Sequence, residues 1–128
     1  PIDILPTLCD RAGVKVNPRQ KFQGRSFAKA LIDDAPSHRE YAVSGEHILG
    51  NRIPRKATTP FLITKRWGYT PIGRDGKPEL YEITRDPLAE NDVSEDNPDV
   101  IKELHDLFIE HLRFHGATED FISLWRTN

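Results

Sequence analysis

The sequence is poor in sulfur and in long apolar runs. It has one cysteine and no methionine among its 128 residues, so an intrachain disulfide is excluded, while the cellular compartment stays open. No apolar run approaches the ~18 residues needed to span a bilayer, and no N-terminal signal pattern is visible. Because the chain starts at Pro1 without an initiator methionine, we expect a fragment or a processed product.

The chain also lacks an excess of either positive or negative charge. The formal net charge is −2 and creates no strong long-range field, so neither nucleic acid nor an anionic membrane is supported as a partner. Hydrophobic residues make up 37% of the chain and charged residues 30%, which is typical of a water-soluble globular chain rather than a disordered one. A chain of this length fits one domain with a modest core.

The most informative stretch is Glu79–Val93. Its strand formers are Leu80, Tyr81 and Ile83, and the last two alternate with polar neighbours, which predicts a short half-buried strand. Asp86-Pro87 ends that strand, because proline lacks the N–H that a strand ladder needs and aspartate readily starts a turn.

A long helix is predicted from Pro98 to His115. Asn97 is expected to cap it, proline suits its first position, and Gly116 ends it. Its apolar stripe comprises Ile101, Leu104, Leu107, Phe108 and Leu112. The tail after it, Ala117–Asn128, is predicted to dock as a turn of helix through Phe121, Ile122, Leu124 and Trp125.

A shorter helix is predicted over Asp3–Gly13, with Asp3 as its cap and Gly13 as its left-handed end. Its apolar face carries Leu5, Leu8, Cys9 and Ala12. One stripe on a short helix cannot fold alone, so we expect this face to need a partner surface. In isolation it would be exposed, or buried by a second copy of the chain in a dimer.

The fold class predicted from these signals is α+β. A small antiparallel sheet of about four strands packs against the helix Asp99–His115, with Leu104, Leu107 and Phe108 in the core. The four expected strands are Arg39–His47, Phe61–Thr64, Trp67–Ile72 and Glu79–Thr84.

Four short motifs, in the same order, resemble the sulfatase family of the alkaline phosphatase superfamily. They extend over nearly the whole chain. They are Asp3-Ile4-Leu5-Pro6-Thr7-Leu8 with Ala12-Gly13-Val14; Gly24-Arg25-Ser26 before a short helix at Ala28–Asp33; the hairpin residues Thr64, Arg66, Trp67 and Tyr69; and Leu80-Tyr81-Glu82-Ile83 with Asp86-Pro87. The first is similar to the last helix of the sulfatase catalytic domain.

Five residues depart from the usual sulfatase pattern. They affect the details of that pattern more than the resemblance to the family. An acid is replaced by Gln23, an arginine by Ile63, a lysine by Gly68, a glutamate by Ala89 and an asparagine by Asp92.

The resemblance implies a domain organisation and a chemistry. Residues 1–35 would end an α/β catalytic domain, and residues 36–128 would form the C-terminal sulfatase subdomain. The full-length protein would be a sulfuric ester hydrolase of arylsulfatase type, in which a hydrated formylglycine attacks sulfur and calcium stabilises the sulfate oxygens. Its partners would be the upstream catalytic domain and an anionic sulfate ester. No catalytic or metal-binding residue of that kind is identifiable here, so the isolated chain is expected to be inactive.

Two single side chains invite a catalytic interpretation that their surroundings do not favour. Cys9 precedes Asp10-Arg11 rather than the Cys-x-Pro-x-Arg setting that sulfatases convert to formylglycine, and its apolar face favours a small core residue. Ser26 has Ala28 where a nucleophile elbow has its last glycine, and no strand precedes it, so a cap of the short helix is favoured.

His111 and His115 lie one turn apart on the long helix. That spacing places two imidazoles on one face, as in some zinc sites. A zinc site needs further ligands, which the sequence does not place, so packed or partly exposed imidazoles are favoured.

The best local candidate for substrate contact is the loop Glu46–Lys56. Guanidinium groups bind sulfate oxygens in bidentate fashion, and in sulfatases the C-terminal subdomain borders the mouth of the active site. The loop's candidate substrate-binding residues are His47, Arg52, Arg55 and Lys56. The competing interpretation, a solvated cationic loop, is favoured by the sequence alone.

Two other functions stay open. The superfamily also contains phosphatases and phosphonate hydrolases on the same scaffold, which metal content and the upstream nucleophile would separate. The chain can also be a non-catalytic interaction module, although the missing methionine argues against a free-standing product.

Overall fold

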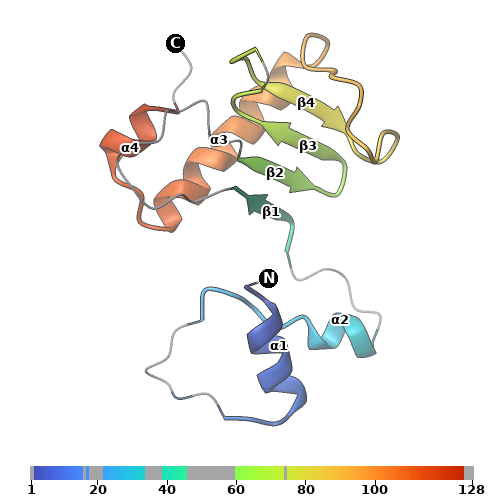
Figure 1. The fold of residues 1–128 in the computed structure, drawn as a ribbon, viewed down its shortest axis with the longest axis vertical. Coiled ribbons are helices and arrows are strands. Elements are labelled where there is room, and N and C mark those ends of the chain that lie inside the picture. Colours follow the sequence, from blue (N-terminus) through green and yellow to red (C-terminus); the bar gives the residue numbers. More distant parts are fainter. Residues whose placement is uncertain are drawn as a thin grey trace. The chain divides into compact units, whose positions relative to one another are not determined.

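The computed structural model describes residues 2–15, 17, 22–33, 39–45, 60–73 and 75–125. They form two compact bodies, Pro1–Glu40 (unit 1) and Tyr41–Asn128 (unit 2), which Figure 1 shows as a helical part and a part with a sheet. The assignment of residues 1–35 to the end of a catalytic domain stays a prediction. Within the described ranges, no helix has both the length and the apolar character needed to cross a bilayer.

Unit 1 contains helices α1 (Ile4–Arg11) and α2 (Ala28–Ile32). Gly13 follows α1 at φ +65°, the left-handed conformation predicted for the residue after the helix. The Asp3 side chain occupies the N-cap position but makes no capping hydrogen bond. The predicted Asp3 cap is therefore wrong, and the reason lies in the partners of this carboxylate, described below.

Unit 2 is built on a four-stranded antiparallel sheet in the order β1-β2-β3-β4. The strands are Tyr41–Ser44, Phe61–Thr64, Trp67–Thr70 and Glu79–Glu82. Each pairs with its neighbour in sequence, with Val43 opposite Leu62, Leu62 opposite Tyr69, and Tyr69 opposite Leu80. The predicted α+β architecture is confirmed.

The predicted strands agree in place and differ at their ends. The bounds of β2 are as expected, whereas β3 stops before Pro71, which has no N–H to donate to a ladder. The strand β4 stops at Glu82, because the N–H groups of Arg85 and Asp86 both donate to the Glu82 carbonyl in a turn. The predicted first strand extended to His47, which lies outside the described residues.

The free edge of β4 is covered by the segment that follows it. The Leu80 N–H donates to Asp92 Oδ1 at 3.0 Å, and the Leu80 carbonyl accepts from the Val93 N–H at 2.8 Å. Burial disfavours the Asp92 charge, but hydrogen bonds from Leu80 and Ser94 outweigh it and hold the pKa of Asp92 below its ordinary value. Asp92 thus supplies the acceptor that the asparagine of the sulfatase pattern would also offer.

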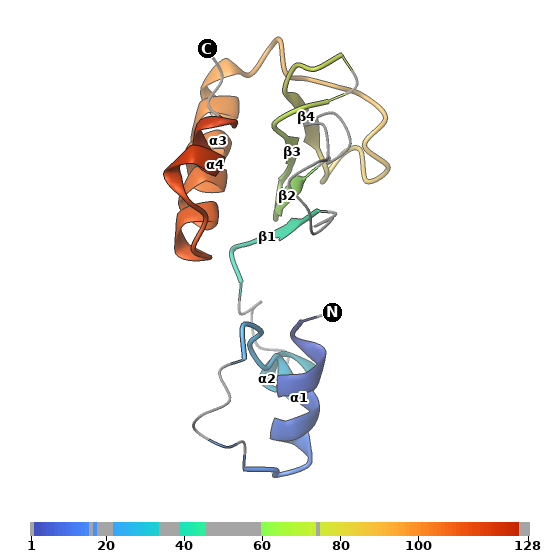
Figure 2. The same ribbon diagram turned by 60° about the vertical axis from the view of Figure 1, so that its left-hand side comes forward.

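Helix α3 (Pro98–Phe114) packs on one face of this sheet, and α4 (Glu119–Ser123) lies against α3 (Figure 2). Asn97 is at the N-cap of α3, yet its side chain donates to the Val93 carbonyl at 2.8 Å instead of capping the helix. The predicted side-chain cap is wrong here too: the bond to Val93 orients the amide group, and its oxygen accepts no N–H of the first helical turn. Gly116, at φ +83°, follows the end of α3 as expected.

The core of unit 2 lies between the sheet, α3 and the tail. Its buried residues are Leu62, Tyr69, Leu80, Leu104, Phe108, Ile109, Ile122 and Trp125. Leu107, predicted for the core, is only partly buried. Ile109 was not predicted, and it is buried because α4 also packs on α3 and widens the covered surface beyond one stripe.

The sheet face away from Leu62, Tyr69 and Leu80 explains one departure from the sulfatase pattern. A Cβ on Gly68 would stand 2.5 Å from Phe61 Cζ and 2.9 Å from Ile83 Cδ1. The two side chains close over the glycine, so any larger residue requires both to move. Glycine at this position is fixed by packing on that face.

Candidate functional site

The four predicted substrate-binding residues, His47, Arg52, Arg55 and Lys56, lie outside the described residues. The described chain places only the ends of their loop. Ser44 is paired with Phe61 in the register of β1 and β2, so both ends of the loop leave the sheet at the same end of the hairpin.

The sheet end that carries this loop is held by polar contacts. Thr70 is buried, and its Oγ1 donates to the Pro60 carbonyl at 2.8 Å. On the neighbouring strand Tyr81 Oη donates to Glu79 Oε2 at 2.7 Å. The Thr70 bond holds Pro60, the residue before β2, and therefore one attachment point of the loop.

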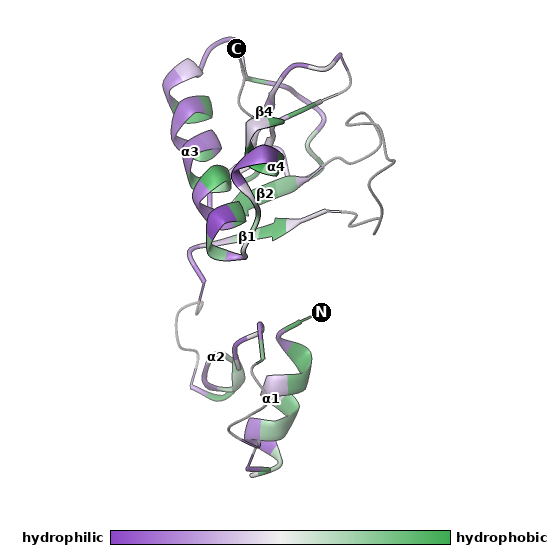
Figure 3. Ribbon diagram, turned by 90° about the vertical axis from the view of Figure 1, so that its left-hand side faces the viewer, coloured by the Kyte–Doolittle hydropathy of each residue, from purple (hydrophilic) through white to green (hydrophobic). Residues whose placement is uncertain are grey.

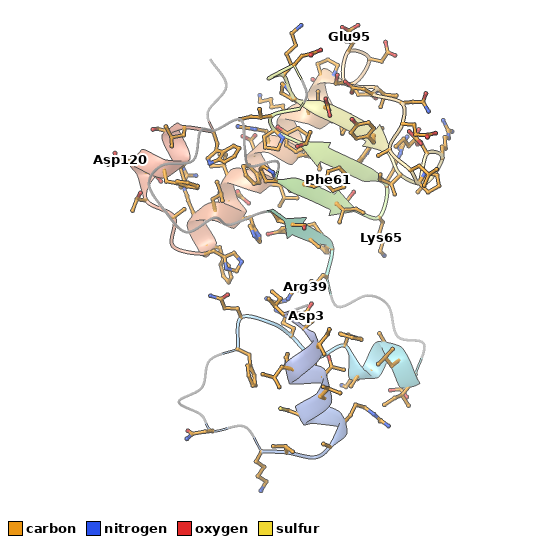
Figure 4. The ribbon with its side chains drawn as sticks, in the orientation of Figure 1. Asp3, Arg39, Phe61, Lys65, Glu95 and Asp120 are labelled. Atoms are coloured by element: carbon orange, nitrogen blue, oxygen red, sulfur yellow. The ribbon has the colours of Figure 1, made fainter. Side chains whose placement is uncertain are left out.

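In unit 1, Asp3 joins segments that are distant in sequence. Its carboxylate accepts from Arg39 Nη2 at 2.6 Å and from Arg39 Nε at 2.9 Å, a bidentate ion pair, and from the Arg25 N–H at 2.7 Å. Figure 4 shows the Asp3 and Arg39 side chains side by side. The guanidinium and this amide occupy the oxygens that a helix cap would need, which is why the predicted cap does not form.

The second contact of unit 1 involves a buried polar residue on α1. Thr7 Oγ1 donates to the Asp3 carbonyl at 2.6 Å and accepts from the Phe27 N–H at 3.1 Å. Thr7 is buried, whereas Leu5 and Leu8 on the same helix are exposed. The inner side of α1 is thus polar, and its apolar side faces outward, in agreement with the expectation for the isolated chain.

The contacts of Cys9 and Ser26 are those of residues that support the fold. Cys9 is a half-buried free thiol on α1. Ser26 Oγ donates to Asp10 Oδ2 at 2.7 Å and accepts from the Ala28 N–H at 3.2 Å. Phe27, not Ser26, is the N-cap of α2, so the predicted position of the cap is wrong by one residue although the serine does bind the first helical amide.

The rings of His111 and His115 contact each other at a tilt of 51°, with centroids 4.4 Å apart, and His111 also makes an edge-to-face contact with Tyr41 at 5.7 Å. Among the described residues no group of three or more His, Cys, Asp or Glu side chains is arranged to hold a metal ion. His111 is half-buried and His115 is exposed.

A buried polar pair connects β3 to α3. Tyr69 Oη lies 2.9 Å from His105 Nδ1, and the His105 ring also bonds to the backbone of Trp125. Burial raises the pKa of Tyr69. Burial is also the main influence on His105 and lowers its pKa, against the Asp106 charge and the Trp125 contact, which raise it. Tyr69 and His105 are far apart in sequence and carry no shared motif, so sequence reasoning missed them.

This pair predicts how stability responds to pH. Because the pKa of His105 is lowered in the folded state, the unfolded chain takes up a proton near the ordinary value of 6.5 before the folded chain does. The stabilisation is complete above that pH and is lost as the pH falls below it toward the folded-state pKa. We expect the free energy of unfolding to fall between pH 7.5 and 5.5, with most of the loss below the ordinary value of 6.5.

The measurement is urea unfolding at several pH values for the wild type and for His105→Gln. Glutamine offers an acceptor to Tyr69 and a donor to Trp125 without titrating. Its stability is expected to change less over this window than that of the wild type. Equal pH slopes for the two proteins would assign the effect to other groups.

Sequence reasoning also missed that Arg66 and Arg85 share one carboxylate. Both bond to Glu82, by Arg66 Nε at 2.9 Å and by Arg85 Nη1 at 3.3 Å. Arg66 is distant from Glu82 in sequence, and the register that places Trp67 opposite Glu82 brings them together. The sequence predicts both strands, but the register between them could not be fixed from sequence.

No family model matches the chain. It is 28% identical over 133 residues to a protein of Schizosaccharomyces pombe described as an uncharacterized sulfatase, covering 95% of this chain and 23% of that protein.

Two solved structures are similar in both sequence and fold. A candidate sulfatase from Bacteroides thetaiotaomicron is 28% identical with a TM-score of 0.67, and a protein described as a 2-O GAG sulfatase is 27% identical with a TM-score of 0.66. Each match covers 87% of this chain and 24% of the other. The chain thus spans about a quarter of the length of the relatives it matches, and in sequence and fold it resembles the C-terminal portion of sulfatases.

Proposed function

We propose that this chain is the C-terminal portion of a hydrolase that cleaves sulfate esters, and that its own role is structural, bordering the mouth of the active site. The observation that carries the proposal is the joint resemblance in sequence and fold to proteins described as sulfatases. Because the chain spans only about a quarter of those relatives, the activity belongs to a longer polypeptide in this proposal.

The outward apolar side of α1 supports this role. Leu5 is 55% exposed and Leu8 60% exposed, and Leu31 and Ile32 at the end of α2 are exposed as well. Figure 3 shows the apolar residues along α1. Apolar surface of this extent on a short helix favours a covered state. In the proposal the upstream α/β catalytic domain covers it, and a second copy of the chain is the substitute when that domain is absent.

The cofactors implied by the resemblance do not fit the described residues of this chain. The only cysteine, Cys9, lies on α1 before Asp10-Arg11, not in a Cys-x-Pro-x-Arg setting. The described carboxylates form no cluster that could hold calcium. Formylglycine and calcium are therefore proposed to belong to the upstream domain, and no step of the reaction is assigned to residues described here.

The substrate loop is the contribution of this chain to the proposed site. His47, Arg52, Arg55 and Lys56 offer cationic donors that suit a sulfate group. The loop connects two strands whose adjacent ends are paired at Ser44 and Phe61, and a loop held at both ends by a sheet can shape specificity without taking part in bond cleavage.

The test compares two purified polypeptides, the 128-residue chain and the native polypeptide that contains it. Both are assayed with an aryl sulfate and with an aryl phosphate, and the native polypeptide is mapped by mass spectrometry. We expect aryl sulfate turnover and an aldehyde-bearing Cys-x-Pro-x-Arg or Ser-x-Pro-x-Arg peptide in the native polypeptide, and no turnover by the 128-residue chain.

Each result decides something. Turnover by the sequence-verified 128-residue chain would refute the structural role. Phosphate turnover with an unmodified nucleophile would move the assignment to phosphoester chemistry. A native polypeptide without either activity would favour a non-catalytic interaction module.

A further inference from the structure

One end of the sheet in unit 2 gathers cationic side chains from two elements. Lys65 and Arg66 form the turn between β2 and β3, and Arg85 follows β4. Both sites reach the same end because Trp67 is paired with Glu82. This end is opposite the one from which residues 46–59 leave the sheet, since Ser44 and Phe61 are paired at that other end.

A carboxylate holds the two guanidinium groups in place. Glu82 Oε1 accepts from Arg66 Nε at 2.9 Å, and Glu82 Oε2 lies 3.3 Å from Arg85 Nη1. The Glu82 side chain is only 17% exposed, whereas those of Arg66 and Arg85 are 60% and 81% exposed. The acid is thus the inner anchor, and the two cations present their remaining N–H donors to solvent.

Arg66 is further ordered by an aromatic ring. Its guanidinium carbon lies 4.6 Å from the centroid of the Trp67 ring, the distance of a cation–π contact. Trp67 itself packs against the core of unit 2, so the stacked guanidinium rests on a fixed surface. An arginine held in this way loses less conformational entropy when it binds a planar or tetrahedral oxyanion.

The local charge is positive. Lys65, Arg66 and Arg85 carry positive charges against the single negative charge of Glu82. Asp86, next to Arg85, keeps its negative charge, and its carboxylate accepts from the N–H groups of Glu90 and Asn91. Figure 4 shows Lys65 projecting from the β2–β3 turn, away from Glu95 and Asp120.

A second arginine–carboxylate pair in unit 2 provides the contrast. Arg113 Nε lies 2.9 Å from Glu119 Oε1, the same distance as in the Arg66–Glu82 pair. The charge of Glu110 also acts on Arg113. Arg113 is thus one cation influenced by two acids, whereas Glu82 holds two arginines.

We propose that Arg66 and Arg85, supported by Glu82, Trp67 and Lys65, form a surface site for sulfate groups of an anionic polysaccharide. Two adjacent guanidinium groups can each donate two N–H groups to the oxygens of a sulfate. Lys65 adds attraction at longer range. The choice of a sulfated ligand rests on the proposed function. Because the site lies at the opposite end of the sheet from the ends of the predicted substrate loop, it would bind sulfate groups other than the ester that is cleaved.

The experiment measures binding of heparin, a sulfated polysaccharide, to the 128-residue chain by isothermal titration at low and moderate salt. Desulfated heparin and inorganic sulfate are the comparison probes. We expect binding to heparin that weakens as salt rises. The double substitution Arg66→Gln/Arg85→Gln is expected to weaken it at least about tenfold, and the matched substitution Arg113→Gln less than about twofold.

Glu82→Gln separates an organised site from simple charge attraction. The substitution adds one unit of positive charge but removes the anchor of both arginines. Weaker heparin binding supports the organised pair, whereas tighter binding would refute it. Equal binding by the double variant and the wild type, equal binding of desulfated heparin, or no heparin binding at all would each overturn the site. Since no turnover is measured, failure here leaves the proposed hydrolase assignment untouched.

Discussion

Replacing Phe108 by alanine is expected to lower the free energy of unfolding of unit 2 by about 3–5 kcal/mol. The side chain is 1% exposed and lies at the centre of the core formed by the sheet, α3 and the tail. Its ring meets that of Trp125 edge-on, with centroids 5.5 Å apart, so alanine removes both apolar burial and an aromatic contact. Domains of this size have only about 5–15 kcal/mol of stability in total.

Phe114 supplies the control for this prediction. It lies on the same helix and is 79% exposed, with its ring against His115. Phe114→Ala is expected to change the free energy of unfolding by less than about 0.5 kcal/mol. Urea unfolding followed by far-ultraviolet circular dichroism compares the two variants, and similar losses for both would contradict the described packing of α3.

Trp125→Ala is expected to have an effect of similar size, about 3–5 kcal/mol, through the docking of α4. Trp125 is 6% exposed and contacts the rings of Phe108 and Phe121. Its backbone also receives the hydrogen bond from His105. Loss of the indole leaves a cavity beside Phe108, so we expect α4 to detach before the rest of unit 2 unfolds. Amide hydrogen exchange of residues 119–124 would detect this.

Two substitutions serve as controls for Trp125→Ala. Trp125→Phe keeps a ring in the cavity, and the indole Nε1–H that it removes has no hydrogen-bond partner among the described residues. We therefore expect Trp125→Phe to lower the free energy of unfolding by well under half as much as Trp125→Ala. The neighbour Leu124 is 52% exposed, and Leu124→Ala should be nearly neutral. Protected α4 amides in Trp125→Ala would show that the helix is held by other contacts.

The elements best predicted from sequence are those whose signals are local. Pro98, Gly116 and the spacing of Leu104 and Phe108 locate α3 without any knowledge of its partners. The alternation around Tyr81 likewise locates β4. Such signals give the existence and type of an element, whereas its ends depend on contacts such as the turn at Glu82.

The errors share one cause, which is competition from distant groups. Asp3 and Asn97 both have the residue type of a helix cap, and both direct their side chains to other partners, Arg39 and the Val93 carbonyl. A cap preference of about 1 kcal/mol is easily exceeded by a bidentate ion pair that sequence spacing does not reveal.

The candidate sites likewise divide into residues that local sequence can identify and residues that only tertiary contacts bring together. The cations Arg52, Arg55 and Lys56 could be picked out by composition, but they fall outside the described residues, so their role stays a prediction. The pair Tyr69–His105 and the group around Glu82 depend on strand register and helix placement. Register is fixed by which side chains must be buried together, which a single sequence specifies only once the partner strands are known.

In the strand order β1-β2-β3-β4, each pairing closes a loop formed by the residues that connect its two strands, and these loops differ in length. The connection between β2 and β3 is only Lys65-Arg66, whereas residues 45–60 separate β1 from β2. Closing a longer loop costs more chain entropy, so the pairing of β1 with β2 carries the largest such penalty in the sheet. Among the described strands, β1 is also an edge strand, paired only with β2. Its release is therefore expected to cost the least free energy of the pairings in this sheet, and the β2-β3-β4 sheet and α3 can stay folded when it occurs.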